Sequence, residues 1–342
     1  MWKRRAQWAV GLIVLLVIVM VATAIALWRD RPDIHAAGWP APAGFRTSTT
    51  DQVTVTWLGV STLLFDDGET QILIDGFFSR PSLQDILLRR PVTNDMAIIN
   101  YAMNEYRMRR LAAIIPVHSH FDHAMDVGAI ANRSSASILG SESTLAIARG
   151  AGVPEDQITP VSTGQRYEFG RFGVTLLPSN HAPIGWSGSV PFAGTIDAPL
   201  TLPRAVSSMR EGGTYTIVID HAQGTAIVQG SAGFPDSALE DMTADVVFLS
   251  VGGLETLGRD YVEQYWQAMV TATGARTVYP VHFDDFTRPF GDIVAAPRVL
   301  GDLEITVEWF NALRDRWDID TRLILPAFGE PVAIYAEPSS ET

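Results

Sequence analysis

Four side chains with metal-binding chemistry lie within one short segment. The segment follows an apolar run typical of a β-strand and comprises, in order, His118, Ser119, His120, Phe121, Asp122 and His123. Because side chains alternate along an extended chain, His118 and His120 point to one side. The turn that follows lets Asp122 and His123 face a neighbouring point. The spacing therefore predicts two adjacent metal positions.

The residue types restrict the metal that such a site would hold. Imidazole and carboxylate groups suit zinc or a similar first-row ion, whereas a calcium site would require oxygen ligands alone. The chain contains no cysteine, so nitrogen and oxygen must supply every protein ligand. The alternative interpretation is that these side chains are the polar residues of a surface loop.

Apart from its basic N-terminus, the chain is strongly acidic. The formal net charge is -13, from 25 basic and 38 acidic residues in a chain of 342. Without Lys3, Arg4 and Arg5, 22 basic residues face 38 acidic ones, a balance of -16. Such a surface repels phosphate backbones, so nucleic acid is not expected as a partner.

An uncharged apolar segment stands near the N-terminus. It runs for 21 residues from Trp8 to Trp28, a helical length that matches the roughly 30 Å of a bilayer's hydrocarbon core. Basic residues precede it and tryptophan stands at each end, which predicts an inside N-terminus. We expect a single-pass inner-membrane anchor, with the catalytic domain on the periplasmic or extracellular side. The alternative is a cleaved signal peptide, because Ala22-Thr23-Ala24 and Ala24-Ile25-Ala26 resemble cleavage sites.

The remaining chain is predicted to form one α/β domain, so the organisation is an anchor over residues 1–30, a linker over 31–50 and a domain over 51–342. Short β-rich runs predict strands at residues 53–57, 62–65, 71–74, 113–117, 173–177, 215–219, 225–228, 246–250 and 277–281. Helices are expected at residues 95–110, near Leu145, and at 260–273 and 304–314. This interleaving predicts sheets covered by helices, without an internal repeat.

The pattern H-x-H-x-D-H after a strand resembles the signature of the metallo-β-lactamase superfamily, and the resemblance runs from about residue 53 to about residue 335. It implies an αββα sandwich with metals at one edge between the sheets. It also implies that His181, at the end of one strand, and His282, at the end of another, are metal-binding histidines. Asp75 resembles the family's early aspartate that orients a ligand histidine; the alternative is a plain turn aspartate.

Two later motifs refine the resemblance. The sequences Trp57-Leu58-Gly59 and Val281-His282-Phe283-Asp284-Asp285 are most similar to the branch that contains N-acylphosphatidylethanolamine-hydrolysing phospholipase D and the ascorbate-phosphate lactonases. The chain also departs from the family pattern twice. Val60 stands where that branch usually has histidine, and Ser231 stands where most hydrolases of the family have a bridging aspartate.

The resemblance implies two zinc ions. One would be held by His118, His120 and His181, and the other by Asp122, His123 and His282. A shared hydroxide would be the only bridge, and the second metal should bind less tightly than it would with a carboxylate bridge. Three neutral imidazoles leave zinc Lewis acidic, lowering the pKa of bound water to about 7. Asp122 would ligate the second metal and orient the hydroxide.

These ligands favour hydrolysis of a small-molecule or lipid substrate. The expected function is that of a membrane-anchored zinc-dependent hydrolase, whose metal-bound hydroxide cleaves a phosphodiester, ester or lactone, lipid-derived compounds included. Three alternatives stay open: a β-lactamase-like amide hydrolase, a mono-iron oxidoreductase and an inactive metal-binding scaffold. The six-ligand set argues against the mono-iron oxidoreductase.

The other candidate residues carry weaker signals. His221 lies in a predicted hairpin turn, where it would contact substrate or, more simply, be solvated, and His35 in the linker is expected to be inert. The segment from Ala182 to Gly213 is a long loop, which would cover the site, touch the membrane or only pack on the surface. Tyr261, Tyr265 and Trp266 are expected to be helix core.

Overall fold

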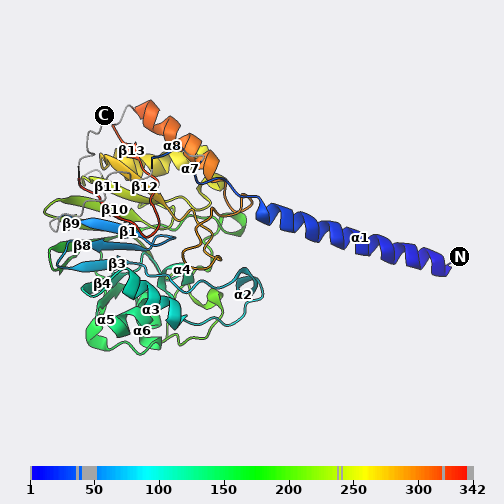
Figure 1. The fold of residues 1–342 in the computed structure, drawn as a ribbon, viewed down its shortest axis with the longest axis horizontal. Helices are drawn as coiled ribbons and strands as arrows, with labels where there is room; N and C mark the ends of the chain where they lie inside the picture. The colour runs from blue at the N-terminus through cyan, green and yellow to red at the C-terminus, as the bar shows by residue number, and fades with distance from the viewer. Residues whose placement is uncertain are drawn as a thin grey trace.

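Two mixed β-sheets lie face to face between layers of helices (Figure 1). The structure is a computed structural model that describes residues 2–35, 38–40, 52–236, 239, 242–317 and 320–336. Much of the predicted linker, residues 36, 37 and 41–50, falls outside the described residues. The α/β sandwich expected from the sequence is confirmed.

The first sheet has seven strands in the order β14-β1-β2-β3-β4-β5-β6. Their bounds are Pro331–Ala333 for β14, Thr54–Trp57 for β1, Leu63–Asp66 for β2, Gln71–Ile74 for β3, Leu111–Ile115 for β4, Ser137–Gly140 for β5 and Ile158–Pro160 for β6. Strands β1 to β3 form the predicted antiparallel meander, and β3 to β6 run parallel. The parallel half places the carboxyl ends of β3 and β4 at one edge.

The second sheet also has seven strands, in the order β13-β12-β11-β10-β9-β8-β7. Their bounds are Arg322–Leu323 for β13, Thr277–Val281 for β12, Val246–Ser250 for β11, Gly224–Gln229 for β10, Thr214–His221 for β9, Phe172–Ser179 for β8 and Arg166–Phe169 for β7. Strands β7 to β10 pair antiparallel and β10 to β13 pair parallel. The carboxyl ends of β8, β10, β11 and β12 therefore meet at a common edge.

Helices cover both outer faces. On the first sheet lie α3 (Met96–Glu105), α5 (Val127–Ser134) and α6 (Glu142–Gly150), with the short helices α2 (Leu83–Leu87) and α4 (Phe121–Ala124) beside them. The second sheet is covered by α7 (Arg259–Trp266), which continues as a π-helical turn over Gln267–Thr271, and by α8 (Leu303–Trp317). Buried rings join α7 to α8: Trp266 contacts Phe310 with 5.1 Å between ring centroids, which fits the prediction that Trp266 is helix core.

The interior between the sheets is aromatic and aliphatic. Phe65 of β2 and Phe248 of β11 meet edge to face across the sandwich, with centroids 5.8 Å apart. Both rings are buried, and this packing holds the two sheets together where each contributes only short strands. Because the sheets cannot slide without opening this core, the loops at their common edge keep a fixed relation.

The N-terminal segment is one long helix, α1 (Trp2–Arg29), which projects away from the body (Figure 1). Among the described residues it is the one helix long and apolar enough to cross a membrane, judged by its length and composition. Its side chains are exposed along the apolar run. These properties suit either a membrane anchor or a signal sequence.

Candidate metal centre

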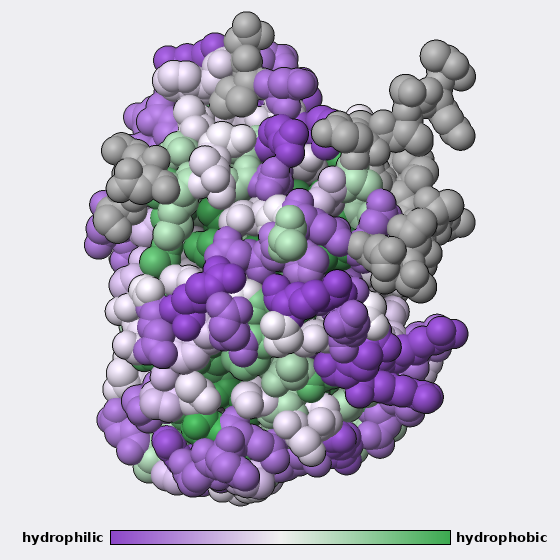
Figure 2. Space-filling view, turned by 90° about the vertical axis from the view of Figure 1, so that its left-hand side faces the viewer, coloured by the Kyte–Doolittle hydropathy of each residue, from purple (hydrophilic) through white to green (hydrophobic). Residues whose placement is uncertain are grey.

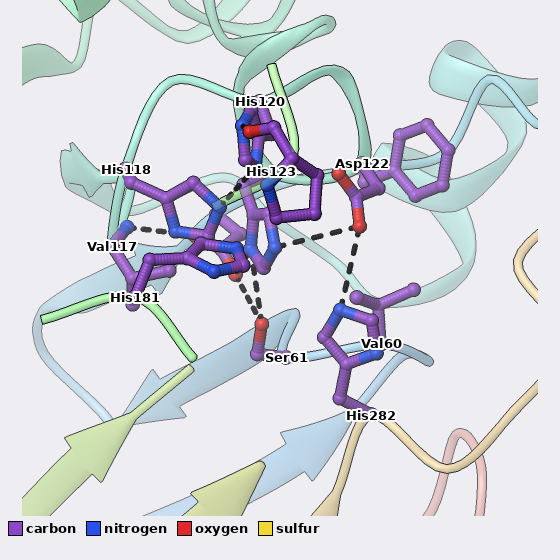
Figure 3. Close-up of polar contacts among 12 residues, drawn as sticks. Val60, Ser61, Val117, His118, His120, Asp122, His123, His181 and His282 are labelled. Carbon is purple, nitrogen blue, oxygen red and sulfur yellow. Dashed lines mark hydrogen bonds and ion pairs between the residues drawn. The ribbon is translucent and has the colours of Figure 1, made fainter. Parts of the chain in front are cut away.

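The six predicted ligands come from three segments of the chain at the common edge of the two sheets. His118 and His120 follow β4, and His120 begins α4, which carries Asp122 and His123. His181 lies just beyond the end of β8, and His282 directly follows β12. Residues separated by more than 160 positions in the sequence therefore converge at one point (Figure 3).

The convergence produces two groups, each able to hold a metal ion. His118, His120 and His181 form the first, and Asp122, His123 and His282 form the second. Within each group the ligand atoms lie within 4.8 Å of one another. These are the two groups that the resemblance implied. Which metal they hold is not fixed by their geometry.

The first group presents lone pairs to a common point. His118 Nε2 and His120 Nδ1 lie 2.9 Å apart, and the His118 Nδ1 atom is buried without a hydrogen-bond partner among the described residues. His120 Nε2–H donates to the carbonyl oxygen of Pro191 at 2.8 Å, and His181 Nδ1–H donates to that of Ala182 at 2.7 Å. These two donations leave His120 Nδ1 and His181 Nε2 as acceptors, the form in which imidazole binds a metal.

Burial keeps these imidazoles neutral. It lowers the pKa of His118 and His181, and it lowers the pKa of His120 to about 3. Neighbouring histidines lower the pKa of His118 further, because a second positive charge would be unfavourable there. Neutral imidazole is the state that ligates a metal, so no proton has to leave these three side chains when a metal binds.

The second group pairs a carboxylate with two imidazoles. Asp122 Oδ2 lies 3.4 Å from His282 Nε2 and 3.5 Å from His123 Nε2. Burial alone would raise the pKa of Asp122, but these two histidines hold it below its ordinary value. The carboxylate is therefore ionised at neutral pH. The donor set of one carboxylate and two imidazoles suits a divalent first-row ion.

Asp75 orients the second group from behind. Its Oδ2 atom accepts hydrogen bonds from His123 Nδ1 at 2.9 Å and from Ser61 Oγ at 2.7 Å. Its Oδ1 atom accepts the backbone N–H of Val117 at 2.9 Å. Asp75 is fully buried and directly follows β3. The contact with His123 is the one expected of an orienting aspartate, and Ser61 is a partner that the sequence did not indicate.

The loop after β1 holds His282 through its backbone. The His282 N–H donates to the Val60 carbonyl at 2.9 Å, and Trp57 Nε1 donates to the same oxygen at 2.9 Å. The Val60 N–H in turn donates to Asp284 Oδ1 at 2.7 Å. Position 60 is valine rather than histidine, but the main chain of this loop still positions His282.

A buried cation completes this support. Arg80 is paired with Asp284 at 3.3 Å, and both side chains are almost fully buried. Burial lowers the pKa of Arg80, against the opposing effect of Asp284. The ion pair fixes Asp284, and through Val60 it fixes the loop that carries His282. The sequence offered no signal for Arg80, because its partner lies 204 positions away.

Ser231 lies at the edge of this site, as its alignment with the bridging aspartate predicted. It lines the same cavity as both ligand groups and is buried. Its Oγ donates to the Asn180 carbonyl at 3.3 Å and accepts from Gln229 Nε2 at 3.4 Å. A serine hydroxyl is too short and too weakly basic to replace a carboxylate bridge between two cations.

A cavity of about 150 Å³ opens over the two groups. Its apolar wall includes Phe121, Ile184, Pro191, Phe192 and Phe286. Three of these belong to the long loop at residues 182–213, so that loop covers the site rather than only packing on the surface. The apolar wall and polar floor suit a substrate that presents a polar group to the metals and an apolar part to the loop.

One weaker expectation is wrong. His221 was expected to be a solvated turn residue, but its side chain is buried against Phe172, with ring centroids 5.3 Å apart. It ends β9 at the opposite end of the strand from Thr214 and does not reach the ligand groups. The strand continues two residues beyond the predicted end at residue 219, so His221 belongs to the strand and its side chain is buried.

Two mixed sheets between helices, with paired histidine and aspartate groups at their common edge, define the metallo-β-lactamase fold. No family model matches the sequence. The chain is similar to a UPF0173 metal-dependent hydrolase of Pyrobaculum islandicum, with 25% identity over 240 residues, covering 68% of this chain and 84% of the relative. A UPF0173 metal-dependent hydrolase of Methylobacterium nodulans is 26% identical over 235 residues, covering 68% and 85%.

Among solved structures, the metallo-β-lactamase fold protein YhfI from Bacillus subtilis aligns with a TM-score of 0.48 and 14% identity, covering 82% of this chain and 98% of that one. The fold and the paired ligand groups are those that the resemblance to the metallo-β-lactamase superfamily implied, and the curated relatives that the chain is similar to are named metal-dependent hydrolases. The finer assignment to the phospholipase D and lactonase branch stays a prediction.

Asp75→Asn is expected to weaken metal binding at the second group by roughly 10-fold to 100-fold, because an amide accepts the His123 proton less strongly than a carboxylate does. A chelator competition titration measures this. Asp95→Asn is the matched control, since asparagine caps α3 as well as aspartate and lies away from the site. Equal affinities in wild type and Asp75→Asn would contradict the orienting role of Asp75.

Proposed function

We propose that this chain is a zinc-dependent hydrolase that cleaves a phosphodiester, ester or lactone. The observation that carries the proposal is the convergence of two ligand groups on one cavity, each group with three side chains. Curated relatives over most of the domain are named as metal-dependent hydrolases, which supports the same class. Zinc suits a donor set of imidazole and carboxylate without sulfur.

When bound, two zinc ions supply an activated water near neutral pH and polarise the oxygen of the scissile group. The chain's own residues define where this happens. His118, His120 and His181 would hold the first ion, and Asp122, His123 and His282 the second. The hydrogen bonds that the ligand histidines donate to Asp75 and to the carbonyl oxygens of Pro191 and Ala182 fix the ring orientations before substrate arrives.

Asp122 is the proposed catalytic residue. Its Oδ2 atom faces both His123 and His282 at the floor of the cavity, and its low pKa keeps it ionised. The ionised carboxylate is a hydrogen-bond acceptor, so it would orient the attacking water by accepting a hydrogen bond from it. The scissile group would enter through the cavity mouth beside Ile184 and Phe192.

The proposed setting is a membrane. The apolar run of α1 suits a single-pass anchor, and the basic residues before it favour an inside N-terminus. The domain would then lie on the periplasmic or extracellular side. A lipid-derived substrate fits both this setting and the apolar wall of the cavity. Nucleic acid is not proposed as a partner, because the net charge is -13.

The purified wild-type protein is expected to hold two zinc equivalents, and His118→Ala is expected to lose the ion of the first group together with hydrolytic activity. Elemental analysis and a panel of phosphodiesters, esters, lactones and β-lactams measure both properties. His221→Ala is the matched control, because that histidine lies outside the site. Unchanged stoichiometry in His118→Ala would refute the ligand assignment, and one iron in place of zinc would favour an oxidoreductase.

Ser231→Asp is expected to tighten binding of the second metal, because a carboxylate at this position adds a negative charge beside both ion positions. Turnover can change in either direction, since the same charge lowers the Lewis acidity of the ions. Chelator competition measures the affinity, with Ser231→Asn as a neutral control of similar size. If the affinity for the second equivalent is the same in both variants, Ser231 does not face the metals.

The full-length protein is expected to stay with membranes through a high-salt wash. Insertion of an apolar helix is insensitive to salt, whereas attraction between surface charges is screened. Fractionation followed by sequencing of the N-terminus measures the result. Recovery in the soluble fraction with a new N-terminus near residue 24 or 26 would show that the segment is a cleaved signal peptide.

A further inference from the structure

The chain that follows α1 is bound directly to the domain. The Arg298 N–H donates to the Asp30 carbonyl at 2.9 Å, and Arg298 Nε lies 3.4 Å from Asp30 Oδ1. One residue further, Arg31 pairs with Asp285 at 2.6 Å and donates to the Ala295 carbonyl. The end of the helix is therefore attached to the body without a free spacer.

The segment that contacts the end of α1 also carries one of the metal ligands, His282. Asp285 lies three positions after His282, and its side chain is almost fully buried. The chain then runs to Arg298, where it meets Asp30. The metal-site helix α4 and the loops after β12 accordingly lie in the half of the body from which α1 projects (Figure 1).

Exposed apolar side chains gather at this attachment point. Val299 and Leu300 directly follow Arg298 and are 55% and 49% exposed. Ile184 and Trp186 lie on the loop that covers the cavity, and Trp186 is 92% exposed. Both loops approach Gly253: a Cβ atom built on this glycine would lie 3.3 Å from the Leu300 carbonyl oxygen and 3.6 Å from Ile184 Cγ2. The two loops are therefore adjacent. These four apolar residues are called the rim below.

The rim connects the helix to the cavity mouth. Ile184 is a member of the rim and also lines the cavity over the ligand groups. Apart from the rim, Leu87 and Leu88 at the end of α2 are exposed and are followed by the exposed cations Arg89 and Arg90. In Figure 1, α2 lies on the side from which α1 projects. Leucine beside arginine is a composition that suits a lipid surface.

The opposite face of the body is different in character. Figure 2 shows it as largely hydrophilic, with hydrophobic residues mostly in small patches between polar ones. The turns at that end, around Glu69 and Ala222, are polar or small and exposed. Exposed large apolar side chains cost hydration free energy unless another surface covers them. The exposed apolar side chains of the rim lie beside α1, which makes the bilayer the candidate for that surface.

We propose that the rim is a membrane-docking face that holds the mouth of the cavity against the headgroup region of the bilayer into which α1 inserts. The proposal rests on the anchor and the hydrolytic site of the proposed function. The apolar run of α1 ends at Trp28, so Asp30 and Arg31 lie at headgroup depth. Val299 and Leu300 are one and two residues from Arg298, a distance of at most about 7 Å along the chain, so they share this depth.

Docking in this position determines how substrate arrives. A molecule with an apolar tail would reach the cavity from the bilayer, passing Ile184 and the apolar wall, while its polar group meets the ligand groups at the floor. The inferred substrate class is therefore amphipathic and membrane-resident. A water-soluble substrate would have to enter a mouth that faces lipid.

The absence of cysteine from the chain allows a direct test. Trp186→Cys and Val299→Cys place single thiols on the rim, and Ala222→Cys and Glu69→Cys place them in turns at the far end. Each full-length variant is labelled with an environment-sensitive fluorophore and reconstituted into vesicles of phosphatidylcholine and phosphatidylglycerol. Lipids with a nitroxide near the headgroup then quench any label that touches the bilayer. Metal content, measured for each variant, verifies its fold.

Quenching several times stronger at both rim positions than at both far positions supports the docking face. Quenching at the rim no stronger than at positions 69 and 222 would overturn it. The measurement needs no turnover, so a protein that docks but hydrolyses nothing would refute the proposed function and leave the docking face standing. Conversely, activity without rim quenching would refute only the docking face.

Discussion

The buried carboxylate of Asp75 connects three parts of the site. It accepts from His123, from Ser61 and from the backbone of Val117, so one residue at the end of β3 joins the meander, the loop after β4 and the second ligand group. An isolated carboxylate would be costly in this interior, and three donors offset that cost. The orientation of His123 and the start of the histidine segment therefore depend on the same acceptor.

The sandwich makes this arrangement possible because each ligand comes from a strand end or from the turn that follows it. The edge-to-face contact of Phe65 with Phe248 holds the two sheets in a fixed relative position. The ion pair of Arg80 with Asp284 holds the loop that carries His282. Burial then lowers the pKa of His118 and His120, so their imidazoles are neutral and ready to bind. Fold, hydrogen bonding and electrostatics all favour metal binding at one edge.

Local patterns in the sequence predicted most of this edge. The strands at residues 71–74, 246–250 and 277–281 have the expected bounds, because strongly apolar runs with clear breaks specify them. Asp75 was found through its family-like position, and Ser231 through its alignment with a carboxylate. Strand β5 and helix α5 were missed because their short segments lack a distinct period, and Arg80 was missed because its partner Asp284 is remote in sequence. His221 was wrongly assigned to the turn because β9 extends two residues beyond its predicted end at residue 219, and its side chain is buried.

Each of the two ligand groups is proposed to hold one metal ion. Crystals grown with zinc, measured on both sides of the zinc absorption edge, test this most directly through the anomalous difference density. Two peaks are expected, one among His118, His120 and His181 and the other among Asp122, His123 and His282. A single peak in a site shared by all six side chains, or density located away from them, would contradict it.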